Sequence, residues 1–151
     1  MNLQEELKAL KERIAELEEQ AKEEQEFPQL GDTYWYLGDT GEILYENWDN
    51  VSFEEERLGI GNVFKTEDEA KFAKKKLKVE AELRKFSRPF LCGKFNYYLF
   101  FNIESDSLDT QFTSYCPPQG AIYFESEEKA QQAIKSAGED RIKKYIFGVG
   151  E

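Results

Sequence analysis

The stretch from Thr66 to Phe86 constrains the fold more than any other part of this sequence. Thr66 and Glu69 have the capping-box spacing that begins a helix. Residues at steps of three and four then fall on one face of that helix: Ala70, Ala73, Leu77 and Ala81. Four others fall on nearly the opposite face: Phe72, Val79, Leu83 and Phe86. Two opposed apolar faces need cover on both sides, so we expect this helix to be a central strut.

A row of lysines runs between the two apolar faces of the predicted helix. We call it the lysine row: Lys71, Lys74, Lys75, Lys78 and Lys85. Because affinity for phosphates comes from Lys and Arg, the row predicts a patch for nucleic acid or for an acidic partner. The alternative is a solvated helix face, neutralised by residues 32–70, which carry two basic and eleven acidic side chains. The net charge of −11 disfavours nucleic-acid binding over the whole surface.

Residues 2–25 have the heptad pattern of a coiled-coil helix. Six residues at alternating spacings of four and three form its seam: Leu3, Leu7, Leu10, Ile14, Leu17 and Ala21. In a parallel pair, Glu6 would face Lys11 of the other helix, and Arg13 would face Glu18, with opposite charges in both cases. We therefore predict a parallel homodimer through this helix. The alternative is a helix that folds back onto its own domain.

The chain divides into a coiled-coil helix, residues 1–26, and one α+β domain, residues 27–151. The domain contains two similar units, 32–88 and 94–151. Each unit has an aromatic hairpin, a loop, a short strand and a capped helix, in that order. We expect the two hairpins to form one antiparallel sheet with helices on one face.

The two units match position by position around their helix starts. FKTEDEA at 64–70 matches FESEEKA at 124–130, with the phenylalanine, the capping hydroxyl and the alanine at the same spacing. Upstream, YWYL at 34–37 matches NYYL at 96–99, and each opens a hairpin. The pattern predicts an internal duplication, and the alternative is coincidence between two common helix starts.

The run GNVFKTEDEA at 61–70 continues through LKV at 77–79 to LRKF at 83–86. It resembles a pattern of small proteins encoded by phages and prophages of Gram-positive bacteria, and the resemblance covers about residues 32–88. Members of that family are generally without an assigned function. The resemblance therefore implies an accessory gene of a mobile element, and it brings no catalytic residues.

The residue types that most enzymes and metal sites require are scarce. The sequence has no histidine, so Ser and Cys nucleophiles lack their usual base and metals lack their commonest neutral ligand. Cys92 and Cys116 are not in metal-ligand spacing; we expect two reduced, mostly buried thiols, with a disulfide as the alternative. The acidic run at 54–56 lacks the residue order of a calcium loop. We predict no catalytic residues, no cofactor and no metal.

The N-terminal region is charged and lacks the apolar core of a signal peptide. No apolar run approaches the length needed to span a membrane. We therefore expect a cytoplasmic protein, in the cytosol of a host cell, without membrane association.

A set of aromatic and acidic residues is the best candidate for a partner surface. We call it the acidic–aromatic set: Tyr34, Trp35, Tyr36, Trp48, Phe53, Glu54, Glu55 and Glu56. Aromatic residues often dominate protein recognition, although they could equally be core and sheet residues. We predict a non-enzymatic phage accessory protein that binds a host protein and could inhibit a nucleic-acid-handling or defence enzyme. The alternatives are a nucleic-acid-binding factor that uses the lysine row, and a structural or assembly protein.

Overall fold

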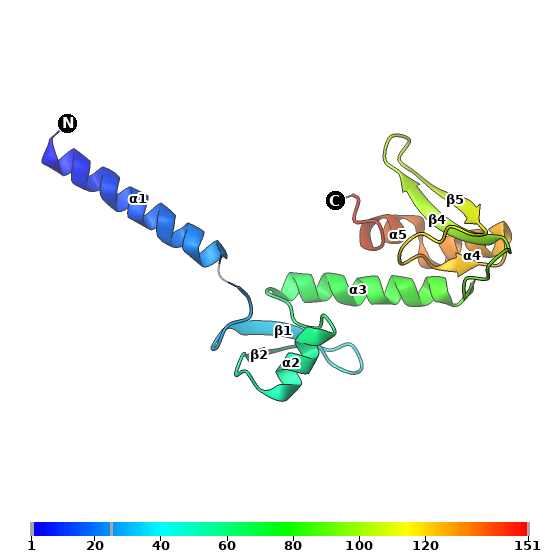
Figure 1. The fold of residues 1–151 in the computed structure, drawn as a ribbon, viewed down its shortest axis with the longest axis horizontal. Coiled ribbons are helices and arrows are strands. Elements are labelled where there is room, and N and C mark those ends of the chain that lie inside the picture. Colours follow the sequence, from blue (N-terminus) through cyan, green and yellow to red (C-terminus); the bar gives the residue numbers. More distant parts are fainter. Residues whose placement is uncertain (1, 25, 151) are drawn as a thin grey trace.

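The computed structural model describes residues 2–24 and 26–150, which form five helices and two antiparallel sheets (Figure 1). The helices are α1 (Leu3–Glu24), α2 (Ser52–Gly59), α3 (Glu67–Arg84), α4 (Glu127–Ala137) and α5 (Glu139–Tyr145). The strands are β1 (Thr33–Leu37), β2 (Ile43–Asn47), β3 (Ser87–Arg88), β4 (Asn96–Asn102), β5 (Ser107–Thr113) and β6 (Tyr123–Phe124). The predicted mixture of helices and antiparallel strands is confirmed.

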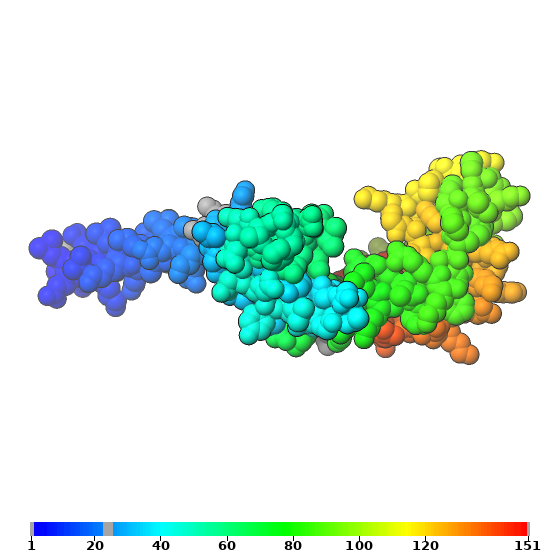
Figure 2. Space-filling model, turned by 90° about the horizontal axis from the view of Figure 1, so that it is seen from below, coloured from blue at the N-terminus to red at the C-terminus, as the bar shows by residue number. Residues whose placement is uncertain are grey.

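α1 points away from the rest of the molecule (Figures 1 and 2). Glu5 and Glu6 lie in its first turn and Lys22 lies in its last turn, where their charges complement the helix dipole. Every residue from 3 to 22 is exposed. The predicted N-terminal helix is confirmed, and in this structure it does not fold back onto its own domain.

The two hairpins lie in separate sheets, so the prediction of one shared sheet is wrong. β1 and β2 form a two-stranded sheet, and the other sheet has the strand order β3-β6-β4-β5. The physical reason is the length of α3, whose 18 residues span about 27 Å at 1.5 Å per residue and hold the hairpins apart. We call β1, β2 and α2 the first lobe and β3 to α5 the second lobe; Figure 2 shows them as two bodies along the molecule.

The first hairpin also has helices on both faces, and not on one face as predicted. Strand alternation turns Tyr34 and Tyr36 to one face, where Arg57 of α2 donates a hydrogen bond to the Tyr34 hydroxyl. Leu37 lies on the other face and lines a groove with Leu77 of α3. The hairpin is therefore held between α2 and α3.

α3 is the predicted strut between the lobes. The Thr66 hydroxyl accepts a hydrogen bond from the Glu69 amide at 3.2 Å, which satisfies one free donor at the helix start. The first hairpin covers the N-terminal part of the helix, where Ala70 is buried. α4 and α5 cover the opposite face: the Phe72 ring packs against Tyr145 of α5 with ring centroids 5.0 Å apart, and Val79 and Leu83 are buried. The face that carries Ala70 and Leu77 is covered along only part of its length, because Leu77 is exposed.

The lobes have separate cores of different composition. The first-lobe core consists of Tyr34, Tyr36 and Trp48. The second-lobe core includes residues from α3 and is mostly aliphatic: Val79, Leu83, Phe124, Ala130, Ala133, Ala137, Ile142 and Tyr145. α3 therefore belongs to the core of the second lobe while it begins against the first.

Each capped helix is preceded by a segment that pairs with the first strand of its own hairpin. Trp35 of β1 forms an antiparallel bridge with Phe64, just before α3. Tyr97 of β4 pairs antiparallel with Phe124 of β6, just before α4. These two pairs occupy the positions that match between the two units in the sequence.

Candidate functional site

Half of the acidic–aromatic set lies in the core of the first lobe. Tyr34, Tyr36, Trp48 and Glu54 are each less than 8% exposed. Buried side chains present no surface to a partner, so the prediction of a partner-binding role needs correction for these four. The two tyrosines are buried because α2 packs on the face of β1 that carries them.

A polar network joins α2 to the first hairpin beneath this core. Nη1 of Arg57 donates to the Tyr34 hydroxyl at 2.7 Å and to the Glu46 carboxylate at 3.1 Å. The Tyr36 hydroxyl donates to the same carboxylate at 2.9 Å, and the guanidinium lies 3.8 Å from the Tyr36 ring centroid. Burial raises the pKa of Tyr34 far above its usual value, so its hydroxyl stays neutral. The network links α2 to the first hairpin, so its geometry fits a structural role.

Glu54 closes the start of α2 in the same region. One of its carboxylate oxygens accepts hydrogen bonds from the backbone amides of Asp49 at 2.7 Å and Val51 at 3.5 Å. Burial alone would raise the pKa of Glu54, but the Tyr34 hydroxyl and these amides outweigh it and lower the pKa below its usual value. Glu54 is therefore a buried helix-start residue, and its charge is held by local donors.

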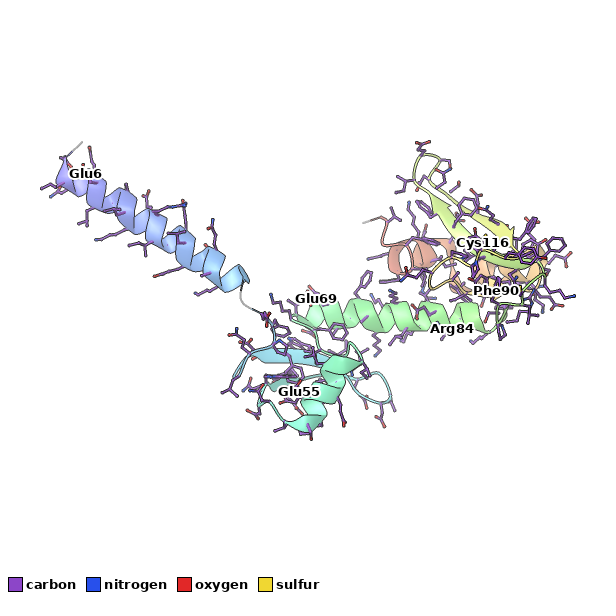
Figure 3. All side chains as sticks on the ribbon, in the orientation of Figure 1. Glu6, Glu55, Glu69, Arg84, Phe90 and Cys116 are labelled. Carbon is purple, nitrogen blue, oxygen red and sulfur yellow. The ribbon has the colours of Figure 1, made fainter. Side chains whose placement is uncertain are left out.

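The rest of the acidic–aromatic set is more accessible. Phe53, Glu55 and Glu56 are exposed on α2, where Figure 3 labels Glu55. Trp35 is half-buried and packs against Tyr45, with ring centroids 5.0 Å apart. These accessible members lie on different elements of the first lobe, and they do not form the single surface that the sequence suggested.

Two members of the lysine row are paired with acidic residues of α3 itself. Nζ of Lys71 lies 3.4 Å from the Glu67 carboxylate, one helical turn earlier. Lys85 donates a hydrogen bond to the Glu82 carboxylate. Such exposed pairs contribute little to stability, but they lower the positive charge that the row presents.

Two further members of the lysine row lie against the lobes. Lys74 is half-buried, and its side chain lies close to Gly41 in the turn of the first hairpin. Nζ of Lys75 lies 5.9 Å from the ring centroid of Tyr145 on α5. Lys78 is exposed. Members of the lysine row thus contact the first lobe, the second lobe or acidic residues of α3 itself. This arrangement fits a solvated helix face better than one continuous binding patch.

The predicted dimer seam is uncovered along α1. Its five large apolar residues, Leu3, Leu7, Leu10, Ile14 and Leu17, are between 47% and 83% exposed. Figure 3 shows side chains projecting from all sides of α1, with Glu6 near its start. An apolar stripe of this length in water favours association.

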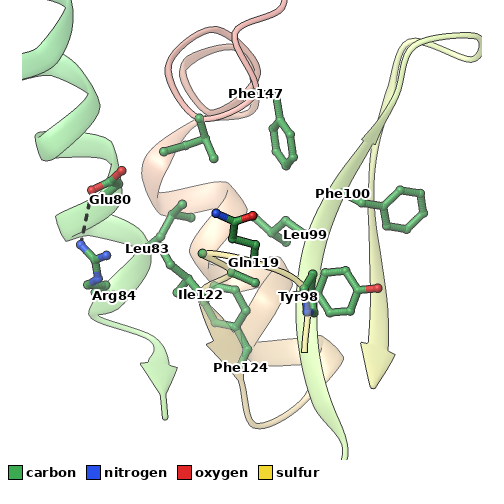
Figure 4. Close-up of a pocket in the computed structure, with 14 residues that line it drawn as sticks. Glu80, Leu83, Arg84, Tyr98, Leu99, Phe100, Gln119, Ile122, Phe124 and Phe147 are labelled. Carbon is green, nitrogen blue, oxygen red and sulfur yellow. Dashed lines mark hydrogen bonds and ion pairs between the residues drawn. The ribbon is translucent and has the colours of Figure 1, made fainter. Parts of the chain in front are cut away.

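A groove runs along the second lobe between α3, β4 and the C-terminal end of α5 (Figure 4). It has a volume of about 360 Å³, and apolar side chains make most of its walls, among them Leu83, Leu99, Ile122, Phe124 and Phe147. Glu80 and Arg84 form an ion pair at 3.5 Å on the α3 side. We call it the second-lobe groove.

A second groove, of about 530 Å³, lies between the first hairpin and α3. We call it the first-lobe groove, and its lining includes Leu37, Ile60, Phe64, Ala73 and Leu77. Asn62 fixes its floor, because the Asn62 side chain accepts from the Leu37 amide and donates to the Leu37 carbonyl, both at 2.8 Å. Ile60 is 80% exposed and Leu77 is 56% exposed. The groove presents apolar side chains to solvent.

Sequence reasoning missed both grooves. A signal was present, because Leu77 and Ala81 lie on the predicted apolar face of α3 but outside the part that one hairpin can cover. A second signal was that Leu37 and Leu99 occupy matching positions in the two sequence units. Each of them lines a groove in the structure.

The cysteines also differ from their prediction. Cys92 and Cys116 are free, and both are exposed where burial was expected. Both lie in loops that flank the second hairpin, where segments run over the surface, and Figure 3 shows Cys116 near Phe90. Phe95 and Phe112 pack there with ring centroids 4.9 Å apart and are also exposed.

Among the residues that the structure describes, no three His, Cys, Asp or Glu side chains gather as a metal site would require. No described helix is long and apolar enough to cross a membrane. The first-lobe and second-lobe grooves are lined mostly by apolar side chains, which suits recognition of an apolar segment of a partner.

Comparisons with known proteins did not identify a relative of this chain. No protein-family model matches the sequence, and no curated protein and no solved structure matches it either. The resemblance to proteins of phages and prophages stays a prediction. Surfaces and grooves therefore carry the functional argument.

Proposed function

We propose that this protein is a non-enzymatic accessory protein that dimerises through α1 and acts by binding another protein. The observation that carries the proposal is the exposed heptad seam of α1. Burying apolar surface contributes about 25 cal/mol per Å², so a second copy that covers the seam gains stability. The accessory context comes from the resemblance of residues 32–88 to phage and prophage proteins.

The charges beside the seam favour a parallel second copy. Glu6 and Lys11 flank the seam, as do Arg13 and Glu18, and both pairs attract across a parallel dimer. Within one chain, Nη1 of Arg13 lies 3.2 Å from the carboxylate of Glu16. Exposed pairs of this kind contribute at most about 1 kcal/mol, so Arg13 can exchange that partner for Glu18 of a second chain.

The same proposal includes the internal duplication. Ser126 caps α4 as Thr66 caps α3, by accepting a hydrogen bond from the amide three residues later, at 3.1 Å and 3.2 Å respectively. The backbone pairs before the two helices also occupy matching positions, as Phe64 and Phe124 show. These correspondences support descent of both lobes from one unit. A dimer would then present two copies of each groove.

Light scattering on the intact chain tests the dimer. We expect twice the 17.7 kDa chain mass, and we expect Leu10→Lys to halve it by placing a charge in the seam. Ala15→Lys is the matched control, because Ala15 lies on the same helix but outside the seam and should leave the dimer intact. An intact chain that is monomeric would overturn the proposal.

Disulfide trapping tests the parallel orientation. Leu3→Cys in a chain with Cys92→Ser and Cys116→Ser should form a disulfide-linked dimer under mild oxidation, because Leu3 lies in the seam and would face its own copy in a parallel pair. In an antiparallel pair the two residues would be about 33 Å apart, the length of a 22-residue helix, and no bond could form.

Capture from a bacterial lysate tests the binding function. Immobilised intact protein should retain a host protein in stoichiometric amount from a Gram-positive host. Recovery of no such protein would count against a role in partner binding. The acidic residues that stay exposed on α2, Glu55 and Glu56, are the first to neutralise if the partner handles nucleic acid.

A further inference from the structure

We propose that the first-lobe groove binds an amphipathic helix of another protein, in the way that the second lobe binds α3. The occupant carries two apolar residues four positions apart and a carboxylate just before the second of them. This site deepens the proposed binding function and rests on it and on the duplication of the lobes.

The two grooves lie at matching places in the two lobes. Leu37 and Phe64 line the first-lobe groove, and the matching Leu99 and Phe124 line the second-lobe groove. In each lobe, one of these residues lies on the first hairpin strand and the other just before the capped helix. The same backbone arrangement thus forms one wall of both grooves.

In the second lobe a helix lies across this site. α3 packs on α4, where Ala133 and Ala137 are completely or almost completely buried. The Ser136 hydroxyl of α4 donates a hydrogen bond to the Glu82 carboxylate of α3 at 3.0 Å. Val79 and Leu83, four positions apart on α3, bring apolar side chains into the same core. A helix is therefore the natural cover of this kind of surface.

In the part of the chain that the structure describes, no helix covers the corresponding surface of the first lobe. Ala73, Lys76 and Leu77 of α3 match Ala133, Ser136 and Ala137 of α4, and all three line the groove. Leu77 is 56% exposed, whereas Ala137 is 1% exposed. The first lobe repeats the docking surface of the second without the element that covers it.

The charge at the groove defines the occupant further. Lys76 takes the position of Ser136, so a carboxylate placed as Glu82 is placed would meet the ammonium group of Lys76 in the first lobe. Two apolar residues placed as Val79 and Leu83 would contact Leu77 and Ile60. Amphipathic helices dock in apolar grooves through side chains at such spacings.

A fluorescent peptide of residues 67–86 is the probe, because it carries Val79, Glu82 and Leu83 in one helix. Fluorescence anisotropy with the intact protein should show saturable binding. Leu77→Glu in the protein should weaken binding at least about tenfold, because it places a charge in the apolar contact. Ile103→Glu is the matched control, since Ile103 is also exposed but lies in the β4–β5 turn, and it should leave binding unchanged.

A charge exchange tests the contact with Lys76. Lys76→Glu should weaken binding about fivefold, and a peptide with Glu82→Lys should restore it to that variant. Far-UV circular dichroism verifies that each variant is folded, and Ile60→Glu on the other wall is a second variant with the same expected loss. Absence of saturable binding, or binding that Leu77→Glu leaves unchanged, would overturn the proposal.

The dimer and the groove can fail separately. An intact chain that is monomeric but binds the peptide would keep the groove and overturn the dimer. If Leu77→Glu instead converts a dimeric intact chain into a monomer, a segment of a second copy occupies the groove, and the proposal of a partner helix is wrong.

Discussion

The first and second lobes each contain an antiparallel hairpin, but they close their cores differently. The second lobe has an aliphatic core that α3 completes from outside the lobe, with Leu83 buried in it. The first lobe has an aromatic core that its own α2 closes, through the network of Arg57, Glu46 and two tyrosines. The difference shows that the apolar face of a hairpin needs a cover, which can come from the lobe's own helix, as α2 does, or from a neighbouring helix, as α3 does.

The comparison also explains the two faces of α3. The first lobe covers one face of the helix near its N-terminal end, and the second lobe covers the opposite face from Phe72 to Leu83. Leu77 is exposed on the part of the first face that no described element covers. Five predictions test how far this difference between the lobes extends.

The largest expected difference is in the free energy of unfolding, between substitutions on the buried face and on the exposed face of α3. Leu83→Ala removes a side chain that is 2% exposed and should lower the free energy of unfolding by about 2–5 kcal/mol. Leu77→Ala makes the same change on the same helix, where the side chain is exposed, and should change stability by less than about 0.5 kcal/mol. Urea denaturation followed by far-UV circular dichroism measures both. Equal losses would mean that Leu77 is buried in solution.

We expect a smaller difference in stability between two asparagines whose side chains hydrogen-bond to both backbone groups of another residue. Asn96 is fully buried, accepts from the Leu91 amide and donates to the Leu91 carbonyl, both at 2.9 Å. Asn62 makes the same two bonds to Leu37 but is only half-buried. We expect Asn96→Ala to cost about 1–3 kcal/mol and Asn62→Ala about 1 kcal/mol, because buried groups left unpaired cost more. The reverse order in urea denaturation would contradict this difference between the lobes.

The first lobe should lose stability in acid. The pKa values of Glu46 and Glu54 lie below the usual value, so both carboxylates stabilise the folded state above a pH of about 4.3 and lose that effect as pH falls through their lowered pKa values. Both tryptophans, Trp35 and Trp48, lie in this lobe, so tryptophan fluorescence during urea unfolding reports on it. We expect the urea concentration at the unfolding midpoint to be lower at about pH 3.5 than at about pH 6.

Glu54→Gln tests the origin of that pH dependence. At neutral pH the variant should lose about 1–2 kcal/mol, because the backbone amides of Asp49 and Val51 lose a charged acceptor. Its midpoint should fall less on acidification than that of the unchanged protein. The same fall in both proteins would assign the acid sensitivity to other groups.

The smallest effect should show the lobes behaving alike. Thr66→Ala and Ser126→Ala each remove a capping hydroxyl of the same geometry, and each should cost about 1 kcal/mol in urea denaturation. Thr66→Ser and Ser126→Thr keep the acceptor and should cost less. A cost at only one helix start would argue against equivalent units.

Local signals in the sequence predicted the elements well. The capping hydroxyls of Thr66 and Ser126, the turn at Gly38–Gly41 and the heptads of α1 each act over a few residues, so the chain itself determines them. The burial of Tyr34 and Tyr36 was not predictable in this way. Alternation shows that both lie on one face of a strand, but not which element packs on that face.

Spacing along the chain was enough to predict α1, α3, α4, the hairpins and the two apolar faces of α3, whereas α2 formed where a loop was predicted. The separation of the hairpins into two sheets, the burial of Glu54 and the exposure of Leu77 followed only from the three-dimensional packing. These outcomes depend on where an 18-residue helix ends in space and on what packs against each side of it. Contacts between distant segments are a property of the whole fold, and no local pattern carries them.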